Sequence, residues 1–525
     1  MRIAMIYLAL VSFGFSQPLF NIVVLFRREF HISFLDAVLV VAVFQYGVVL
    51  FLLGLRGLVR GLREHMDYLV YFFAVIGVIR EVQQTYIETE GLDLLTKAGL
   101  LIGMLAGASI VIFILRRQAD SALHLAGFLC PIFGGVFLYQ LATHAIPLQR
   151  AADETPAEIS APPVMLVLLD ELSLEMLLSG DGEIDAALFP NFHRLSRKGV
   201  WYRRAIANYL HTTYSVPSLL TGSFKIGDLM TGGGGIDDLE RLPPQSLLWR
   251  LSSEGYRVVV YSNHMACGGQ KFSCHGYLSG GSAWFLARVL GKFIEEFGPD
   301  FLVNSYLPQL TGMRLLSEHD FLKNIASDLR NGTFYFIHLM TSHEPYVFDR
   351  TGRFHYSRHN RMAMGSDFPA TLANYREQLR YLDTVMGEFL EKLKRYPHGR
   401  QPVVAVISDH GNCWTADCPG RINPRLIRTI EPSLVRIPVM LFGSGIAPRI
   451  DDDDFQLVDL LPTLLEAIGL PIPNELTVDG APRLNSPPPP RRRHYYLMPG
   501  NAPVSLKLPA VSEPVGRVVE PTNNH

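Results

Sequence analysis

Three polar clusters after residue 162 carry side chains that could ligate a metal ion. Each follows an apolar run, and the clusters are Asp170 with Glu171, His343 within the stretch Thr341–Tyr346, and Asp409 with His410. Imidazole nitrogens suit zinc, and carboxylate oxygens suit calcium, magnesium or manganese. We therefore predict that Asp170, Glu171, Asp409 and His410 hold one or two divalent ions.

A candidate nucleophile lies in the stretch NYLHTTYSVPSLLTG, residues 208–222. Thr212 and Thr213 stand just before an apolar run that predicts a helix, and Pro217 suits the first turn of that helix. A hydroxyl at a helix N-terminus faces backbone N–H groups and a dipole that favour negative charge. The stretch therefore has two interpretations, a nucleophilic threonine or an ordinary threonine N-cap.

Together these residues could support metal-assisted displacement at phosphorus or sulfur. Thr212 would be a further metal ligand, and its acidified hydroxyl would attack the ester to give a covalent intermediate. His343 would bind the transferred group or protonate the leaving oxygen. Arg421 and Arg425 could bind anionic oxygens, or they could be solvated surface residues.

The elements that would position these residues alternate between strands and helices. The expected strands are Val164–Leu169, Val258–Tyr261, Phe334–Leu339, Val403–Ile407 and Val439–Phe442; the clearest helices are Phe192–Lys198 and Leu372–Tyr396. This alternation predicts an α/β/α domain with a largely parallel central sheet. Ligands bind at the carboxyl ends of the strands in such sheets, which is where the polar clusters stand.

The first part of the chain is dominated by long apolar runs. We predict five membrane spans at 3–26, 34–55, 66–80, 97–115 and 124–146, each near the roughly 20 residues that cross a bilayer. The predicted domains are a transmembrane helical domain over 1–146, a linker over 147–162, a catalytic domain over 163–484 and a proline-rich, loosely ordered tail over 485–525.

Charged residues in the loops predict the orientation in the membrane. Basic residues follow spans two and four, whereas the loop after span three is acidic. The positive-inside rule then places the N-terminus in the cytoplasm and the domain after residue 146 outside, on the periplasmic side of an inner membrane. Arg27 and Arg28 after the first span oppose this scheme.

Charge and cysteine content limit the partners and the compartment. The net charge is −2, which gives no argument for a nucleic-acid partner, and we expect none. Cys130 lies in the last predicted span, whereas Cys267 with Cys274 and Cys413 with Cys418 form two close pairs. These pairs favour two local disulfides in an extracytoplasmic domain, and a four-cysteine zinc site is the alternative.

These motifs occur in the order found in the alkaline phosphatase/sulfatase superfamily, which residues 163–472 resemble. The resemblance rests on four short motifs and two supporting stretches: Leu169–Glu171, the Thr212 segment, Ser342–Tyr346, Ser408–Gly411, Arg436–Gly443 and Val458–Leu465. Five spans before such a domain resemble the lipid A phosphoethanolamine transferases and the lipoteichoic acid synthases. The transferases have the nucleophile five residues before a proline, which implies Thr212 rather than Thr213.

Three departures from the family patterns affect this interpretation. Ser215–Leu219 matches the serine form of the sulfatase nucleophile motif except that Leu219 replaces the arginine. The transferases also have a further histidine after Asp-His-Gly, but residues 412–438 contain none. The second half of the anion site is therefore either rebuilt with Arg421 or Arg425, or absent. In addition, the family usually has one glutamate where this chain has Asp170 and Glu171, and we expect Asp170 to be the primary ligand.

The resemblance implies a membrane-anchored, metal-dependent enzyme that moves phosphoethanolamine or glycerol phosphate. Its expected partners are the lipid bilayer, a phospholipid donor and an envelope glycolipid or glycan acceptor. Two alternatives stay open: a sulfatase-like hydrolase of sulfate or phosphate esters, and a non-catalytic envelope scaffold of the same fold.

Overall fold

The computed structural model divides the chain into two compact units. One unit comprises Met1–Leu148 with Ser279–Leu307, and the other comprises Gln149–Leu278 with Pro308–His525. The structure describes residues 2–25, 34–58, 120–140, 159–226, 239–262, 318–354, 368–396, 401–414, 431–471, 478–485, 494–496 and 504–505, with parts of 61–74, 265–275 and 286–290. The domain boundaries predicted from the sequence stay predictions.

The first unit contains apolar helices. The labelled segments are α1 (Arg2–Val11), η1 (Ser12–Ser16), α2 (Gln17–Leu25), α4 (Phe34–Val40), η2 (Val41–Gly47) and α5 (Val48–Leu58). In the described part of the chain, three continuous helices are long and apolar enough to cross a membrane: Arg2–Asn21, Leu35–Leu58 and Asp120–Gln140. The predicted span 97–115 lies outside the described residues, as does most of 66–80. The count of five spans therefore stays a prediction.

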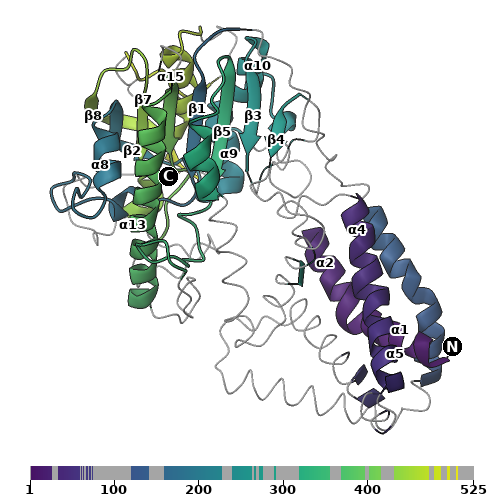
Figure 1. Ribbon diagram of the computed structural model, residues 1–525. Coiled ribbons are helices and arrows are strands. Elements are labelled where there is room, and N and C mark those ends of the chain that lie inside the picture. The colour runs from purple at the N-terminus through teal and green to yellow at the C-terminus, as the bar shows by residue number, and fades with distance from the viewer. Residues whose placement is uncertain are drawn as a thin grey trace. The chain divides into compact units, whose positions relative to one another are not determined.

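The second unit is built on an eight-stranded sheet with the order β4-β3-β5-β1-β6-β7-β2-β8 (Figure 1). Its strands are β1 (Val164–Leu169), β2 (Val200–Ile206), β3 (Arg257–Tyr261), β4 (Ser273–His275), β5 (Thr333–Leu339), β6 (Val403–Ile407), β7 (Val439–Phe442) and β8 (Arg449–Gln456). All neighbouring pairs are parallel except those of β7, which is antiparallel to both β6 and β2. The predicted α/β domain with a largely parallel sheet is confirmed.

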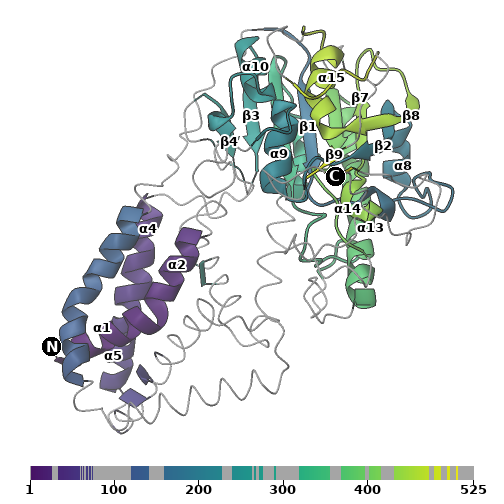
Figure 2. The ribbon, with the colours of Figure 1, turned by 180° about the vertical axis from the view of Figure 1, so that it is seen from behind.

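Helices cover both faces of this sheet (Figures 1 and 2). On one face, α8 (Pro190–Ser196) and α13 (Phe368–Leu393) pack on side chains such as Val167 and Val406. On the other face, α9 (Thr212–Thr221), α10 (Leu247–Ser253) and α15 (Leu460–Ala467) pack on the alternate side chains, including Leu166 and Ala405. Because both faces are covered, β1, β6 and β7 are apolar along their whole length.

The helix that carries the candidate nucleophile begins earlier than its proline suggested. α9 starts at Thr212, its N-cap is His211, and Pro217 lies inside it. The prediction that Pro217 marks the first turn was therefore wrong. Proline has no N–H, so Pro217 cannot make the helical hydrogen bond to the carbonyl four residues earlier. That carbonyl belongs to Thr213, which is exposed near the start of the helix.

Part of the C-terminal segment joins the domain next to α9. β9 (His494–Tyr495) pairs with β10 (Val504–Ser505), and Tyr495 is fully buried. The backbone N–H of Tyr496 donates to the Asn208 carbonyl at 3.0 Å, and the N–H of Leu210 donates to the Tyr496 carbonyl at 3.2 Å. These bonds hold the backbone that leads into Thr212.

Candidate metal and nucleophile site

The ends of β1 and β6 and the start of α9 bring four predicted residues together. The Thr212 hydroxyl oxygen, Oγ1, lies 3.0 Å from His410 Nε2 and 3.4 Å from each carboxylate oxygen of Asp170. Asp170, Asp409 and His410 each offer a ligand atom, and these three atoms lie within 4.8 Å of one another. Residues separated by up to 240 positions in the sequence therefore meet at one point, because β1 and β6 are neighbouring parallel strands.

The orientation of His410 leaves its Nε2 available to the site. Its Nδ1 lies 2.9 Å from the Gly411 carbonyl, which can only accept a hydrogen bond. Nδ1 therefore carries the proton, and the Nε2 of the neutral ring presents a lone pair to Thr212. This is the tautomer that a metal-binding or proton-accepting histidine needs.

Asp170 is held by a residue that the sequence analysis did not select. His338, near the carboxyl end of β5, places Nε2 2.8 Å from Asp170 Oδ2, and both side chains are buried. Burial alone would raise the pKa of Asp170, but the hydrogen bond from His338 and the nearby charges of His343, His338 and His410 lower it below its ordinary value. The only signal in the sequence was a histidine inside the apolar run TFYFIHL.

Asp409 supplies the strongest sign that the site is built for a cation. The carboxylate is completely buried, and no described residue donates a hydrogen bond to its Oδ2. Burial raises its pKa, and the negative charge of Asp170 raises it further. Two buried carboxylates beside an imidazole lone pair form a donor set that a divalent cation would satisfy, so these residues fit the predicted ion.

Glu171 and His343 form a second group beside the first. His343 Nε2 lies 3.0 Å from Glu171 Oε2, and His343 Nδ1 lies 2.8 Å from the Glu344 carbonyl. Asp170, Glu171 and His343 also offer atoms close enough for a second ion. Glu171 has a φ of 64°, a left-handed conformation that is uncommon for residues other than glycine. The residue with this backbone conformation is thus the one whose carboxylate lies beside His343.

Serine hydroxyls fix the three strand ends relative to one another. Ser408 Oγ accepts the Leu172 N–H at 2.9 Å and donates to the His410 carbonyl at 2.7 Å. Ser342 Oγ donates to the Asp170 carbonyl at 2.6 Å. The backbone N–H of Glu171 donates to Asp409 Oδ1 at 3.1 Å. The loops that carry the ligands are therefore tied directly to one another.

Ser215 has a structural role. Its side chain is completely buried, and Oγ donates to the Asp409 carbonyl at 2.6 Å. Thr212, one turn earlier in α9, is partly exposed and directs its hydroxyl at Asp170 and His410. The serine that matches the sulfatase motif thus links α9 to β6, and the threonine faces the site.

Gly411 allows a close approach of two loops. A Cβ atom at this position would lie 1.9 Å from the Ser433 carbonyl oxygen, and the Gly411 N–H donates to the Leu434 carbonyl at 2.9 Å. The glycine of the Asp-His-Gly motif is therefore required because the segment before β7 packs against it.

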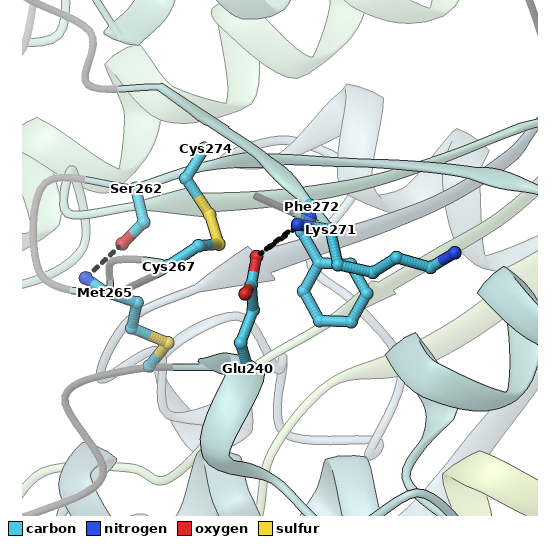
Figure 3. Close-up of a disulfide and its surroundings, with 7 residues drawn as sticks. All are labelled: Glu240, Ser262, Met265, Cys267, Lys271, Phe272 and Cys274. Atoms are coloured by element: carbon cyan, nitrogen blue, oxygen red, sulfur yellow. Dashed lines mark hydrogen bonds between the residues drawn. A yellow bond between two sulfur atoms is a disulfide. The ribbon is translucent and has the colours of Figure 1, made fainter. Parts of the chain in front are cut away.

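The structure describes some of the remaining predicted residues and not others. Arg421 and Arg425 lie outside the described residues, so their roles stay predictions. Cys267 and Cys274 form a disulfide (Figure 3). Cys413 is also disulfide-bonded, and Cys418 lies outside the described residues. Cys130 is a buried free thiol.

A family model matches more than half of the chain. The sulfatase family model, described as "Sulfatase", matches residues 162–470. The 2,3-bisphosphoglycerate-independent phosphoglycerate mutase of Agrobacterium fabrum is 39% identical over 72 residues, which are 14% of this chain and 13% of that protein. The mutase of Paracoccus denitrificans is 32% identical over 96 residues, 18% of this chain and 17% of that protein. The chain thus covers less than a fifth of each of these relatives.

Similar solved structures include two enzymes. The phosphonate monoester hydrolase SpPMH from Silicibacter pomeroyi is 16% identical, covers 63% of this chain and 78% of that chain, and has a TM-score of 0.45. The lipoteichoic acid synthase LtaP from Listeria monocytogenes is 16% identical, covers 62% of this chain and 77% of that chain, and has a TM-score of 0.40.

Proposed function

Because this chain belongs to the sulfatase family and is a sulfatase-like hydrolase or phosphotransferase, we propose that it transfers a phosphate-containing headgroup through a covalent intermediate on Thr212. The proposed group is phosphoethanolamine or glycerol phosphate. The proposed donor is a membrane phospholipid, and the acceptor is an envelope glycolipid or glycan.

One observation carries the choice of transferase over conventional sulfatase. The Thr212 hydroxyl faces Asp170 and His410, while Ser215, at the position of the sulfatase serine, is buried and bonded to the Asp409 carbonyl. Only a hydroxyl that a substrate can reach can act as the nucleophile. The site therefore favours a threonine ester of the transferred group.

Thr212 and His343 have different roles in the proposed reaction. The hydroxyl proton of Thr212 faces acceptor atoms on His410 and Asp170, so it can leave when Oγ1 attacks phosphorus. The bond from Oγ1 to phosphorus forms as the bond from phosphorus to the lipid oxygen breaks, and His343 donates a proton to that oxygen. The acceptor hydroxyl then attacks phosphorus and gives its proton to His343, which had lost one in the first step. The bond from phosphorus to Oγ1 breaks, and Oγ1 takes back the proton that it gave up, which regenerates Thr212.

Asp170, Asp409 and His410 would hold the cation, with Thr212 as a further ligand and Glu171 available to a second ion. A divalent cation bound there would acidify the threonine hydroxyl and offset negative charge on the phosphoryl oxygens. Zinc suits the imidazole of His410, and calcium, magnesium or manganese suit the carboxylates.

The apolar helices support action at a membrane surface. Three described helices are long and apolar enough to span a bilayer, which would keep the enzyme beside a lipid donor. The disulfide between Cys267 and Cys274 supports a location of the second unit outside the cytoplasm, because disulfides persist in oxidising compartments.

Intact-mass spectrometry of the full chain tests this proposal. The purified protein, loaded with zinc or manganese, would be incubated with vesicles that contain phosphatidylethanolamine or phosphatidylglycerol. We expect an adduct of phosphoethanolamine or glycerol phosphate that maps to Thr212 and is absent from Thr212→Ala. Turnover of sulfate or phosphate monoesters with no adduct from either lipid would favour the sulfatase-like hydrolase instead. A protein that binds no metal and turns over no ester would favour the scaffold.

A further inference from the structure

His338 occupies an unusual position for a polar residue. It lies in β5, the strand next to β1, where every residue is buried. One ring nitrogen, Nε2, lies 2.8 Å from Asp170 Oδ2, and the other, Nδ1, lies 3.1 Å from Ser262 Oγ. Both nitrogens thus contact oxygen atoms on neighbouring strands or strand ends. The ring bridges the metal site to the end of β3.

Ser262 is in turn fixed by the loop that follows β3. Its Oγ accepts the Met265 N–H at 3.0 Å, and its own N–H donates to the His275 carbonyl at 3.0 Å. The disulfide between Cys267 and Cys274 closes the same loop, and Cys274 pairs with Val260 of β3. Figure 3 shows Ser262 and Met265 beside the disulfide. The cross-link therefore restricts the segment that positions the serine.

We propose that His338 is a positioning residue of the metal site, which holds Asp170 toward Thr212 with the support of Ser262 and its disulfide-closed loop. This inference rests on the proposed function, because it requires that Asp170 is a metal ligand. Among the described residues, two groups could hold an ion, Asp170 with Asp409 and His410, and Asp170 with Glu171 and His343, and His338 belongs to neither. It acts through the carboxylate.

The physical reason is the freedom of a carboxylate to rotate. Asp170 Oδ2 accepts the hydrogen bond from His338, and both of its oxygens stay at 3.4 Å from Thr212 Oγ1. Without that donor, the buried carboxylate would turn toward other donors, and ion binding would have to restore its orientation. Loss of an outer partner of a metal ligand weakens metal binding by roughly 10- to 100-fold.

Metal affinity of the full chain, measured by competition with a fluorescent zinc chelator, tests the role of His338. We expect His338→Phe, which keeps a planar aromatic ring but has no ring nitrogens, to weaken zinc binding by roughly 10- to 100-fold. His338→Gln, whose amide can still donate to Asp170, should recover most of that loss. The matched control is His275→Gln, which alters a histidine of β4 that stacks on Tyr261; its zinc affinity should equal that of the wild type.

Two further variants test the support behind His338. Ser262→Ala and the double variant Cys267→Ala with Cys274→Ala should each weaken zinc binding by a few-fold, less than His338→Phe does. If circular dichroism shows that His338→Phe does not fold, Ser262→Ala replaces it as the test. A zinc affinity of Ser262→Ala equal to that of the wild type would then overturn the inference.

The outcomes separate this inference from the proposed function. A wild-type protein that binds zinc, together with a folded His338→Phe that binds it equally well, overturns only the inference. A wild-type protein that binds neither zinc nor manganese overturns the proposed function, and the inference with it. Equal weakening in His338→Gln and His338→Phe would show that packing, not hydrogen bonding to Asp170, is what matters, and would also overturn the inference.

Discussion

The Thr212 hydroxyl oxygen lies 3.0 Å from the Nε2 atom of His410, although the two residues are 198 positions apart in the chain. The contact exists because α9 begins beside the carboxyl end of β6. Ser215 strengthens this placement by donating to the Asp409 carbonyl one turn further along the helix. Thr212 is thus fixed to the segment after β6, which carries two of the candidate ligands.

This relationship predicts that Thr212→Ala removes activity without unfolding the domain. Loss of the attacking atom should lower turnover of a phosphodiester probe by roughly a thousandfold or more. Asp170, Asp409 and His410 remain, so zinc should still bind. Thr213→Ala is the matched control because Thr213 is exposed and adjacent, and it should retain activity. If Thr213→Ala lost turnover and Thr212→Ala kept it, the nucleophile would be Thr213 and not Thr212.

Removal of metal should destabilise the protein. Asp170 and Asp409 are both buried, and the negative charge of Asp170 raises the pKa of Asp409, so a cation between them relieves repulsion. Ligand at 100 times its dissociation constant adds about 2.7 kcal/mol. We expect EDTA to lower the melting temperature measured by circular dichroism, and added zinc or manganese to restore it.

Asp409→Asn provides the control for this melting experiment. The variant removes a ligand and also removes the repulsion with Asp170. Its melting temperature should therefore respond to neither EDTA nor zinc. A wild-type protein whose melting temperature ignores both reagents would contradict the metal assignment.

Some elements could be predicted from sequence and others could not, for physical reasons. β1 and β6 are buried on both faces, so their uniform apolar runs gave the correct limits. β8 has the sequence RIDDDDFQ and is an edge strand whose first six side chains are exposed or half-buried. Its carboxylates pair with arginines on β2, as in Arg203 with Asp452 and Arg204 with Asp454. Such cross-strand ion pairs stabilise a sheet without an apolar pattern, which is why both strands were missed.

The candidate site shows the same division. Asp170, Thr212, Asp409 and His410 stand in recognisable motifs, and the structure brings them together. His338 was missed because its role depends on which strand lies beside β1, and β5 follows β1 by more than 160 residues. A single histidine in an apolar strand is also compatible with simple burial. The contact between His338 and Asp170 follows from the order of the strands in the sheet, which the local sequence around His338 does not contain.

Gly411→Ala should destabilise the fold around the Asp-His-Gly turn. The added methyl group would lie 1.9 Å from the Ser433 carbonyl oxygen, so the backbone before β7 must shift. Overpacking of this kind costs about 1–3 kcal/mol. Urea unfolding followed by fluorescence would measure this cost. Gly180→Ala is the control, because a Cβ atom there meets open space, and its free energy of unfolding should match the wild type. Equal stability of the two variants would contradict the close approach.

Acid should destabilise the protein in part through His319, which is completely buried. Its Nε2 lies 2.6 Å from Thr341 Oγ1, and burial, with a small contribution from Lys323, lowers its pKa from 6.5 to about 3. Because the unfolded chain takes up this proton near pH 6.5 and the folded chain does not, stability is full above that pH. It is lost as the pH falls from 6.5 toward 3.

The size of this effect can be isolated with His319→Gln, whose amide can keep the bond to Thr341 but does not titrate. Between pH 7 and pH 5, His319 should contribute a loss of about 2 kcal/mol to the free energy of unfolding. Urea titrations of wild type and His319→Gln at both pH values measure the difference, and the variant should lose less stability by that amount. Other titrating groups affect both proteins alike and cancel in the comparison. Equal losses in the two proteins would show that His319 takes up its proton at the same pH in the folded and unfolded states.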